Sequence, residues 1–551
     1  MRNPVRLLLV LSSLLAAAAA APAEVKLATV FSDHMVLQRG VALPVWGWAT
    51  PGEAVSVTLG QVTKTTTTPA SGRWEVRFDP LQPGPNALAM AVSSTNALLV
   101  KDILVGDVWF GSGQSNMDFT VAAEDRYWCG VYNEKAEVAA ANYPEIRMFK
   151  VKLHMTDTAA PDVQGQWQVT TPETVKKYSA VGYFLSRELF EHLHVPIGFI
   201  DSSYGASTVE AWISPEAMQQ HADYKYLLDN YAKQKAAWAP TAAARTAAFH
   251  KSQPEWAAQA AKDLSAGRFE PRNRVSLGDP TQNQHNPSVL FNGMIAPILG
   301  YPIKGAVWYQ GESNEDKESV VIYRNMVQTM VQDWRTRWGK VSPESAEFPF
   351  LYVQLASLNA PALTPPDHAG IALLREQQRL NLDIPKSAMA VTIDIGDPAN
   401  VHPKNKQELG RRLGLMARKA AYGEDVVASG PLYDSFRVDG SNVTVHFTHA
   451  EGGLASKGGA PVGFALAGAD RKWYWADARI PKAAADKAAA DKAGPDKAGP
   501  DKAGADTVIL SSPSVPSPVA VRYAYADDPP GNLYGKNDAN LPASPFRTDV
   551  W

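Results

Sequence analysis

Residues 107–117, Asp-Val-Trp-Phe-Gly-Ser-Gly-Gln-Ser-Asn-Met (DVWFGSGQSNM), join an apolar strand-like run directly to a turn rich in glycine and serine. Glycines beside a serine let the backbone turn sharply and offer N–H groups to an oxyanion, so Ser115 is a candidate nucleophile. The turn does not match the nucleophile elbow G-x-S-x-G, because Met117 stands in place of the last glycine. It is not a phosphate loop either, because no Gly-Lys-Ser/Thr follows.

Four further apolar runs of this kind follow along the chain, separated by helical patterns. The runs are residues 195–203, 304–311, 348–357 and 388–396, and the helical patterns are residues 179–194, 320–338, 371–382 and 406–421. Near-continuous apolar strands that alternate with helices predict an α/β fold, with a doubly wound parallel sheet covered on both faces. Ligands of such sheets bind beyond the carboxyl ends of the strands.

Polar clusters stand at those ends. They are DSSYG (residues 201–205), QGESN (residues 310–314), and DIGD with NVHP (residues 394–397 and 400–403). Gly205 can bring a backbone N–H to an oxyanion, and Gln310 and Asn314 carry side-chain amides that add donors. His402 is the natural general base for Ser115, because a hydroxyl needs a neighbour with a pKa near 7 to take its proton.

The four blocks, in this order, resemble the SGNH (GDSL-like) hydrolases, and within them the sialate O-acetylesterase branch. The likeness covers nearly all of the chain after its N-terminal segment and includes FSDHMVLQR (31–39), GSGQSNM (111–117), LFNGMI (290–295), WYQGESN (308–314), HPKNKQELGRRL (402–413), NLY (532–534) and LPASPFRTD (541–549). The resemblance implies that Ser115 is the nucleophile and His402 the base. It places the oxyanion hole at the N–H groups of Ser115 and Gly205 and in the Gln310/Asn314 region, and it implies no metal or organic cofactor.

The sequence departs from that family pattern in two places. Many relatives carry two glycines and a threonine where this chain has Gly205-Ala206-Ser207. Many SGNH enzymes place the triad acid three residues before the histidine, where this chain has Ala399. The acid that orients the imidazole is therefore Asp394 or Asp397, or it is absent and a Ser–His dyad rests on a backbone carbonyl. Of these we favour an acid from residues 394–397, without choosing between the two aspartates.

Two further residues are expected to contact substrate. Glu312 stands inside the third block, and we interpret it as an orienting or hydrogen-bonding residue rather than a proton-transferring acid. Arg375 stands at a predicted helix start near the site, where contact with substrate and a packing role are equally expected.

The N-terminus has the pattern of an export signal. Arg2 and Arg6 precede an apolar stretch at residues 7–15, and Ala21-Pro22-Ala23 forms a small-residue cleavage site. We therefore expect a signal peptide at residues 1–23 and a periplasmic or secreted protein. No later run is long and apolar enough to span a membrane. Cys129 is the single cysteine, which excludes an intramolecular disulfide framework.

Short alternating strands flank the α/β region on both sides. Residues 24–104 predict a small β-sandwich, residues 105–423 the hydrolase domain, and residues 424–551 a β-rich domain. A helical insertion is expected at residues 215–280. Residues 482–506 repeat Lys, Asp and small residues without an apolar face, which predicts a surface loop.

Composition and charge limit the functional classes. The 551 residues are 45% hydrophobic with a net charge of −3, which fits a chain that buries real cores and argues against a dedicated nucleic-acid binder. The leading hypothesis is a serine O-acetylesterase acting on an acetylated sugar, most like a sialate O-acetylesterase. The alternatives are an esterase for plant-wall xylan or xyloglucan, or a catalytically weak carbohydrate-binding protein. The oligomeric state is not readable from the sequence.

Overall fold

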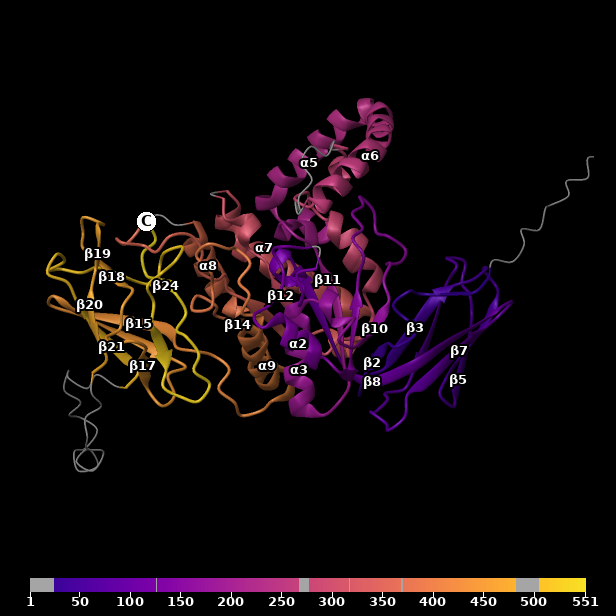
Figure 1. Ribbon diagram of the computed structural model, residues 1–551, viewed down its shortest axis with the longest axis horizontal. Helices are drawn as coiled ribbons and strands as arrows, with labels where there is room; N and C mark the ends of the chain where they lie inside the picture. The colour runs from indigo at the N-terminus through magenta and orange to yellow at the C-terminus, as the bar shows by residue number, and fades with distance from the viewer. Residues whose placement is uncertain (1–23, 125, 267–276, 317, 368–369, 482–504) are drawn as a thin grey trace, which may run out of the picture.

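A large mixed sheet forms the centre of the computed structural model, which describes residues 24–124, 126–266, 277–316, 318–367, 370–481 and 505–551 (Figure 1). Its main path runs in the order β10-β9-β11-β8-β12-β13-β14. The strands are β8 Ala97–Gly113, β9 Tyr143–Lys150, β10 Trp167–Thr170, β11 Ile197–Ser203, β12 Gly305–Tyr309, β13 Phe350–Val353 and β14 Ser387–Ala390. All neighbours on this path are parallel except the edge strand β10, which runs antiparallel to β9.

Helices cover both faces of this sheet. The long ones are α3 Ala180–Leu193, α7 Ser319–Val341, α8 Gly370–Leu380 and α9 Lys406–Tyr422, and the short ones are α1 Ser115–Asp118 and α2 Glu134–Ala140. On one face, Trp334 and Trp338 of α7 pack edge-on against Phe110 of β8. On the other, Gly182 of α3 lies against Phe199 of β11. Every residue of β11 and β12 is buried, which explains the apolar sequence of β12 and of the first four residues of β11.

Strand β8 continues from the central sheet into the N-terminal β region. Its first half pairs antiparallel with β7 and parallel with β2, and a separate three-stranded sheet has the order β1-β3-β6. These strands are β1 Lys26–Leu27, β2 Val36–Gln38, β3 Leu43–Trp48, β4 Ala54–Leu59, β5 Val62–Thr67, β6 Arg73–Phe78 and β7 Leu88–Ser93. The expected border between residues 104 and 105 therefore falls inside one unbroken strand.

The C-terminal part consists of three small sheets at the opposite end of the molecule (Figure 1). Their strands are β15 Leu432–Asp439, β16 Asn442–Thr448, β17 Leu454–Ser456, β18 Phe464–Ala467, β19 Trp473–Trp475, β20 Asp477–Arg479, β21 Thr507–Ser511, β22 Ala520–Tyr523, β23 Leu533–Gly535 and β24 Phe546–Arg547. Most of the low-complexity repeat, residues 482–504, lies outside the described residues.

A helical segment interrupts the α/β alternation between β11 and β12. It contains α4 Pro215–Gln219, α5 Lys225–Trp238 and α6 Ala242–Ser265. Helices α5 and α6 form an arm that projects from the body (Figure 1). No helix among the described residues is long and apolar enough to cross a membrane. The expected signal peptide, residues 1–23, lies outside the part of the chain that the structure describes.

Candidate active site

Ser115 lies at the carboxyl end of the central strand β8, as the first residue of α1. It is half-buried, while its neighbours Gln114 and Asn116 are buried. The turn before it requires glycine, because Gly113 has a φ of 138° and an added Cβ would lie 2.2 Å from the carbonyl oxygen of Tyr309. This close approach of β8 to β12 directs the chain into α1 and leaves the serine hydroxyl facing outward.

Two backbone amides lie beside Ser115 without a protein acceptor. In the part of the chain that the structure describes, neither the N–H of Ser115 nor that of Gly205 donates to another protein group. Gly205 is close, since a Cβ added to it would lie 3.6 Å from the Cβ of Ser115. The Nε2 of His285 contacts the carbonyl oxygen of Ala206 at 2.7 Å and so holds the same loop. Unpaired N–H groups at this place are suited to a developing oxyanion.

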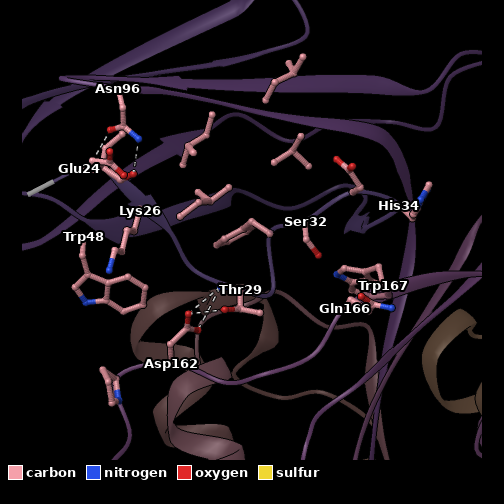
Figure 2. Close-up of a pocket in the computed structure, with 18 residues that line it drawn as sticks. Glu24, Lys26, Thr29, Ser32, His34, Trp48, Asn96, Asp162, Gln166 and Trp167 are labelled. Atoms are coloured by element: carbon pink, nitrogen blue, oxygen red, sulfur yellow. Dashed lines mark hydrogen bonds between the residues drawn. The ribbon is translucent and has the colours of Figure 1, made fainter.

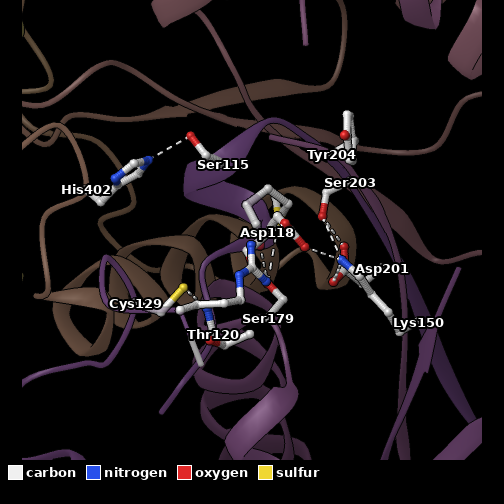
Figure 3. Close-up of polar contacts among 12 residues, drawn as sticks. Ser115, Asp118, Thr120, Cys129, Lys150, Ser179, Asp201, Ser203, Tyr204 and His402 are labelled. Carbon is white, nitrogen blue, oxygen red and sulfur yellow. Dashed lines mark hydrogen bonds and ion pairs between the residues drawn. The ribbon is translucent and has the colours of Figure 1, made fainter. Parts of the chain in front are cut away.

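His402 is in hydrogen-bonding contact with Ser115. Its Nε2 lies 2.8 Å from the Oγ of Ser115, and its ring points at that hydroxyl (Figure 3). The ring of Trp128 packs against the imidazole with centroids 4.5 Å apart, and the guanidinium of Arg126 covers the indole at 4.3 Å. Burial, with the charges of Lys406 and Arg126, lowers the pKa of His402 to about 4. The imidazole is therefore neutral and able to accept a proton at neutral pH.

Neither candidate acid reaches the histidine, which disagrees with the preference for an acid from residues 394–397. Asp394 forms a two-point ion pair with Arg412 and accepts a hydrogen bond from the hydroxyl of Tyr534. Asp397 accepts from the N–H of Ala399 and so shapes the loop before His402. Among the described residues, no carboxylate oxygen hydrogen-bonds His402. This geometry favours the Ser–His dyad over a triad.

The side chains of Gln310 and Asn314 hydrogen-bond the loops around the site. The amide of Gln310 donates to the carbonyl of Ser207 at 3.1 Å and to the Oδ1 of Asn314 at 2.7 Å, which uses both of its hydrogens. The amide of Asn314 donates to buried Glu210. These bonds tie the loop after β12 to the loop after β11. The expected side-chain oxyanion donor is therefore corrected for Gln310, because it has no N–H to spare.

The two expected substrate contacts also have other partners. The Oε1 of Glu312 accepts from the side chain of Asn116 at 2.6 Å, while its Oε2 is buried and has no hydrogen-bond partner among the described residues. Arg375 is fully buried and donates to four backbone carbonyls, those of Leu355, Ala356, Ala526 and Asp527. A guanidinium enclosed in this way cannot touch substrate. Arg375 instead joins the end of β13 to the C-terminal part.

The sequence analysis did not predict one feature of the site, a cluster of ion pairs beside Ser115 (Figure 3). The Nζ of Lys150 donates to Asp118 at 2.6 Å and to Asp201 at 2.7 Å, and Asp118 also pairs with Arg126. Lys150 ends β9, a strand that the sequence analysis missed, so nothing placed it near Ser115. Asp118 lies three residues after the serine and was the one available signal. Among the described residues, no group of His, Cys, Asp or Glu is arranged to hold a metal ion.

A separate cavity of about 1100 Å³ opens between the N-terminal strands and residues 161–167 (Figure 2). None of the predicted site residues lines it. The carboxylate of Asp162 accepts from the N–H and hydroxyl of Thr29, and the side chain of Asn96 bonds the backbone of Val25. These polar groups are occupied in holding residues 25–29, the segment around β1, to its surroundings.

Comparison with known proteins identifies the family. The mouse (Mus musculus) sialate O-acetylesterase is 31% identical over 460 residues, which cover 77% of this chain and 79% of the mouse protein. The chain belongs to the sialate O-acetylesterase family. The human (Homo sapiens) sialate O-acetylesterase is 32% identical over 442 residues, covering 74% of this chain and 73% of the human protein. The family model described as carbohydrate esterase, sialic acid-specific acetylesterase, matches residues 286–420.

A solved structure extends the family likeness to the whole architecture. A carbohydrate acetylesterase from Xanthomonas citri is 32% identical, with a TM-score of 0.75, and the match covers 96% of this chain and 100% of that one. The mixed α/β core and the flanking β-sheets are thus shared with an enzyme of the same class. As a member of the sialate O-acetylesterase family, the protein is a carboxylic ester hydrolase, and the family supports carbohydrate O-acetylesterase activity.

Proposed function

We propose that the protein removes O-acetyl groups from sugars through an acetyl-enzyme on Ser115, within an SGNH-type site. The observation that carries this proposal is the 2.8 Å contact between the Nε2 of His402 and the Oγ of Ser115, beside two unpaired amides. Because Nε2 accepts the serine proton, the neutral imidazole carries its own proton on Nδ1.

The reaction runs in two halves. In the first, Ser115 Oγ attacks the acetyl carbonyl while its proton passes to His402, and the N–H groups of Ser115 and Gly205 bind the oxyanion. The tetrahedral intermediate collapses, and His402 returns the proton to the departing sugar oxygen. In the second half, His402 takes a proton from water, which attacks the acetyl-serine. The second tetrahedral intermediate then collapses, the bond between the acyl carbon and Ser115 Oγ breaks, acetate is released, and His402 returns the proton to Ser115 Oγ. Every proton is carried by one imidazole.

The substrate is proposed from the relatives. The sialate O-acetylesterases to which this chain is similar suggest an O-acetylated sialic acid, and plant-wall xylan or xyloglucan is the alternative. We also propose that residues 1–23 direct export to the periplasm or beyond. Mass spectrometry of the exported protein would then find Glu24 at its N-terminus.

The test is acetate release from acetylated sialic acid and from acetylated xylan and xyloglucan fragments, side by side. Ser115→Ala is expected to lose activity by about 10³-fold or more on whichever substrate is used, because the nucleophile is gone. Ser313→Ala, beside the same site, is the matched serine control. Full activity of Ser115→Ala would overturn the mechanism. Glycan binding without acetate release by the unmodified protein would support the carbohydrate-binding alternative.

A further inference from the structure

The side chain of Asn116 connects the two halves of the Ser–His pair. Asn116 directly follows Ser115 in α1 and is 1% exposed. Its Nδ2 donates to the carbonyl oxygen of Val401 at 2.9 Å, and Val401 directly precedes His402. A single side chain thus bonds the peptide next to the base from the helix turn that carries the nucleophile.

Two further side chains, those of Glu312 and Lys406, fix the orientation of this amide. The Nδ2 also donates to the Oε1 of Glu312 at 2.6 Å, and the Oδ1 accepts from the Nζ of Lys406 at 2.7 Å. A flipped amide would set its oxygen against the Val401 carbonyl, which can only accept, and would lose the bond that its Oδ1 accepts from Lys406. The orientation that donates to Val401 is therefore favoured by hydrogen bonding.

The surroundings of Lys406 make this arrangement rigid. Lys406 is 1% exposed, and its Nζ lies over the rings of Phe119 at 4.7 Å and Tyr309 at 5.1 Å. It is the first residue of α9, four residues after His402. The loop that bears His402 is thus held to α1 at two points, by the Val401 carbonyl and by Lys406, through the same amide.

We infer that Asn116 is the positioning residue of the Ser–His pair, with Lys406 and Glu312 holding its amide. An orienting carboxylate would grip the imidazole; here no carboxylate of the described residues does so, and Asn116 fixes the main chain beside it. The inference rests on the proposed function, because it presumes that Ser115 and His402 react together. A displacement of about 1 Å between two reacting groups costs up to about 10²-fold in rate. We therefore expect the hydrogen bond from Asn116 to Val401 to affect kcat.

The experiment compares Asn116→Asp and Asn116→Ala with the unmodified protein. Each removes the donor to Val401, and Asp also sets a carboxylate against that carbonyl and Glu312. We expect kcat to fall by about 10–100-fold with KM unchanged, and the rate of Ser115 labelling by a fluorophosphonate to fall in parallel. Asn532→Asp is the control, since the Asn532 amide in the C-terminal part also makes two donor bonds and accepts one, its partners being two carbonyls and one backbone N–H.

A second pair of variants decides the matter if the Asn116 variants do not fold. Glu312→Gln keeps an oxygen that can accept from Asn116, whereas Glu312→Leu does not, so Gln should retain more kcat than Leu. Unchanged kcat in folded Asn116 variants, a change in KM alone, or equal losses for Gln and Leu would overturn the inference. Ser115→Ala is assayed alongside. Full activity of Ser115→Ala would mean that the proposed function itself has failed. Inactive Ser115→Ala beside fully active Asn116 variants would reject only the positioning role of Asn116.

Discussion

At the residue scale, the environment of His402 suits a base that works without a carboxylate partner. A triad aspartate stabilises the protonated imidazole, whereas the neighbours here disfavour it: burial acts first, and the charges of Lys406 and Arg126 add to it. Trp128 holds the plane of the ring by packing instead of by charge. The imidazole of His402 is therefore neutral over a wide pH range, but its lowered pKa makes it a weaker base.

This environment predicts where activity is lost in acid. Since His402 must be neutral to act and its pKa is lowered to about 4, kcat/KM on an activated acetyl ester should stay level down to about pH 5 and fall near pH 4. Arg126→Gln removes a cation that disfavours the imidazolium, so the pKa should rise and the acid limb should move to higher pH.

Arg324→Gln serves as the control for this pH profile, because Arg324 pairs with Asp383 outside the site and should leave the limb in place. An acid limb at pH 6.5 or above in the unmodified protein would contradict the account. So would a downward shift in Arg126→Gln.

At the element scale, the strand ends hold the site, and the sequence predicts them well. Predicted strand runs at residues 195–203 and 304–311 correspond to β11 and β12, and the predicted helix at residues 406–421 corresponds to α9. Long apolar runs and helical periodicity are local features of the sequence, so the elements that they mark can be predicted without the tertiary structure. Ser115 and His402 come from two other blocks, residues 107–117 and 400–403, which the structure brings together.

The elements that sequence reasoning missed are those without a local signal. Strand β9 begins with polar residues and β10 has four residues, so neither shows a strand period of its own. Because β9 was not predicted, its last residue, Lys150, was not placed near the site. The donor role expected for Gln310 is not met, and of the two roles expected for Arg375 the structure shows packing. The reason is related: a sequence shows that a polar side chain stands near a site, and not whether folding has already satisfied it.

Two glycines test how the strand ends build the site. Gly113→Ala should abolish stable folding, because a methyl group would lie 2.2 Å from the Tyr309 carbonyl oxygen at a φ of 138°. Gly205→Ala is the matched change at the next strand end, where the nearest atom to the new methyl would be the Cβ of Ser115 at 3.6 Å. It should fold with a nearly unchanged Tm and keep most of its activity, since 3.6 Å is an ordinary van der Waals contact and alanine retains the backbone N–H.

Thermal melts and acetate release on both proteins check this prediction. A stable, active Gly113→Ala protein would show that the close approach of β8 to β12 is not required.

At the scale of the whole molecule, β8 makes the N-terminal β region and the catalytic sheet one structural unit. Buried Asp107, in the middle of this strand, pairs with Arg39 at 2.7 Å and accepts from Gln38 of β2 at 3.0 Å. The hydroxyl of Tyr422, the last residue of α9, reaches the same carboxylate at 2.9 Å. One side chain therefore joins three parts of the chain.

Asp107→Asn tests this coupling. Removing one partner of a buried ion pair should lower the free energy of unfolding by about 3 kcal/mol, while KM of the folded protein stays unchanged. Because the strand is continuous, calorimetry should show the N-terminal region and the catalytic sheet unfolding in the same transition, shifted to lower temperature. Two separate transitions, with only one of them shifted, would contradict the coupling. Lys225→Met, which removes an exposed pair with Asp229 in α5, should cost about 0.5 kcal/mol or less.

The measurement that tests the central claim most directly is acid quenching of the enzyme during turnover of an activated acetyl ester, followed by peptide mass spectrometry. The account predicts an added acetyl group on the peptide that contains Ser115, and none in Ser115→Ala. Acetate release without any acetylated Ser115 peptide, or an acetyl group found on another residue in both proteins, would contradict it.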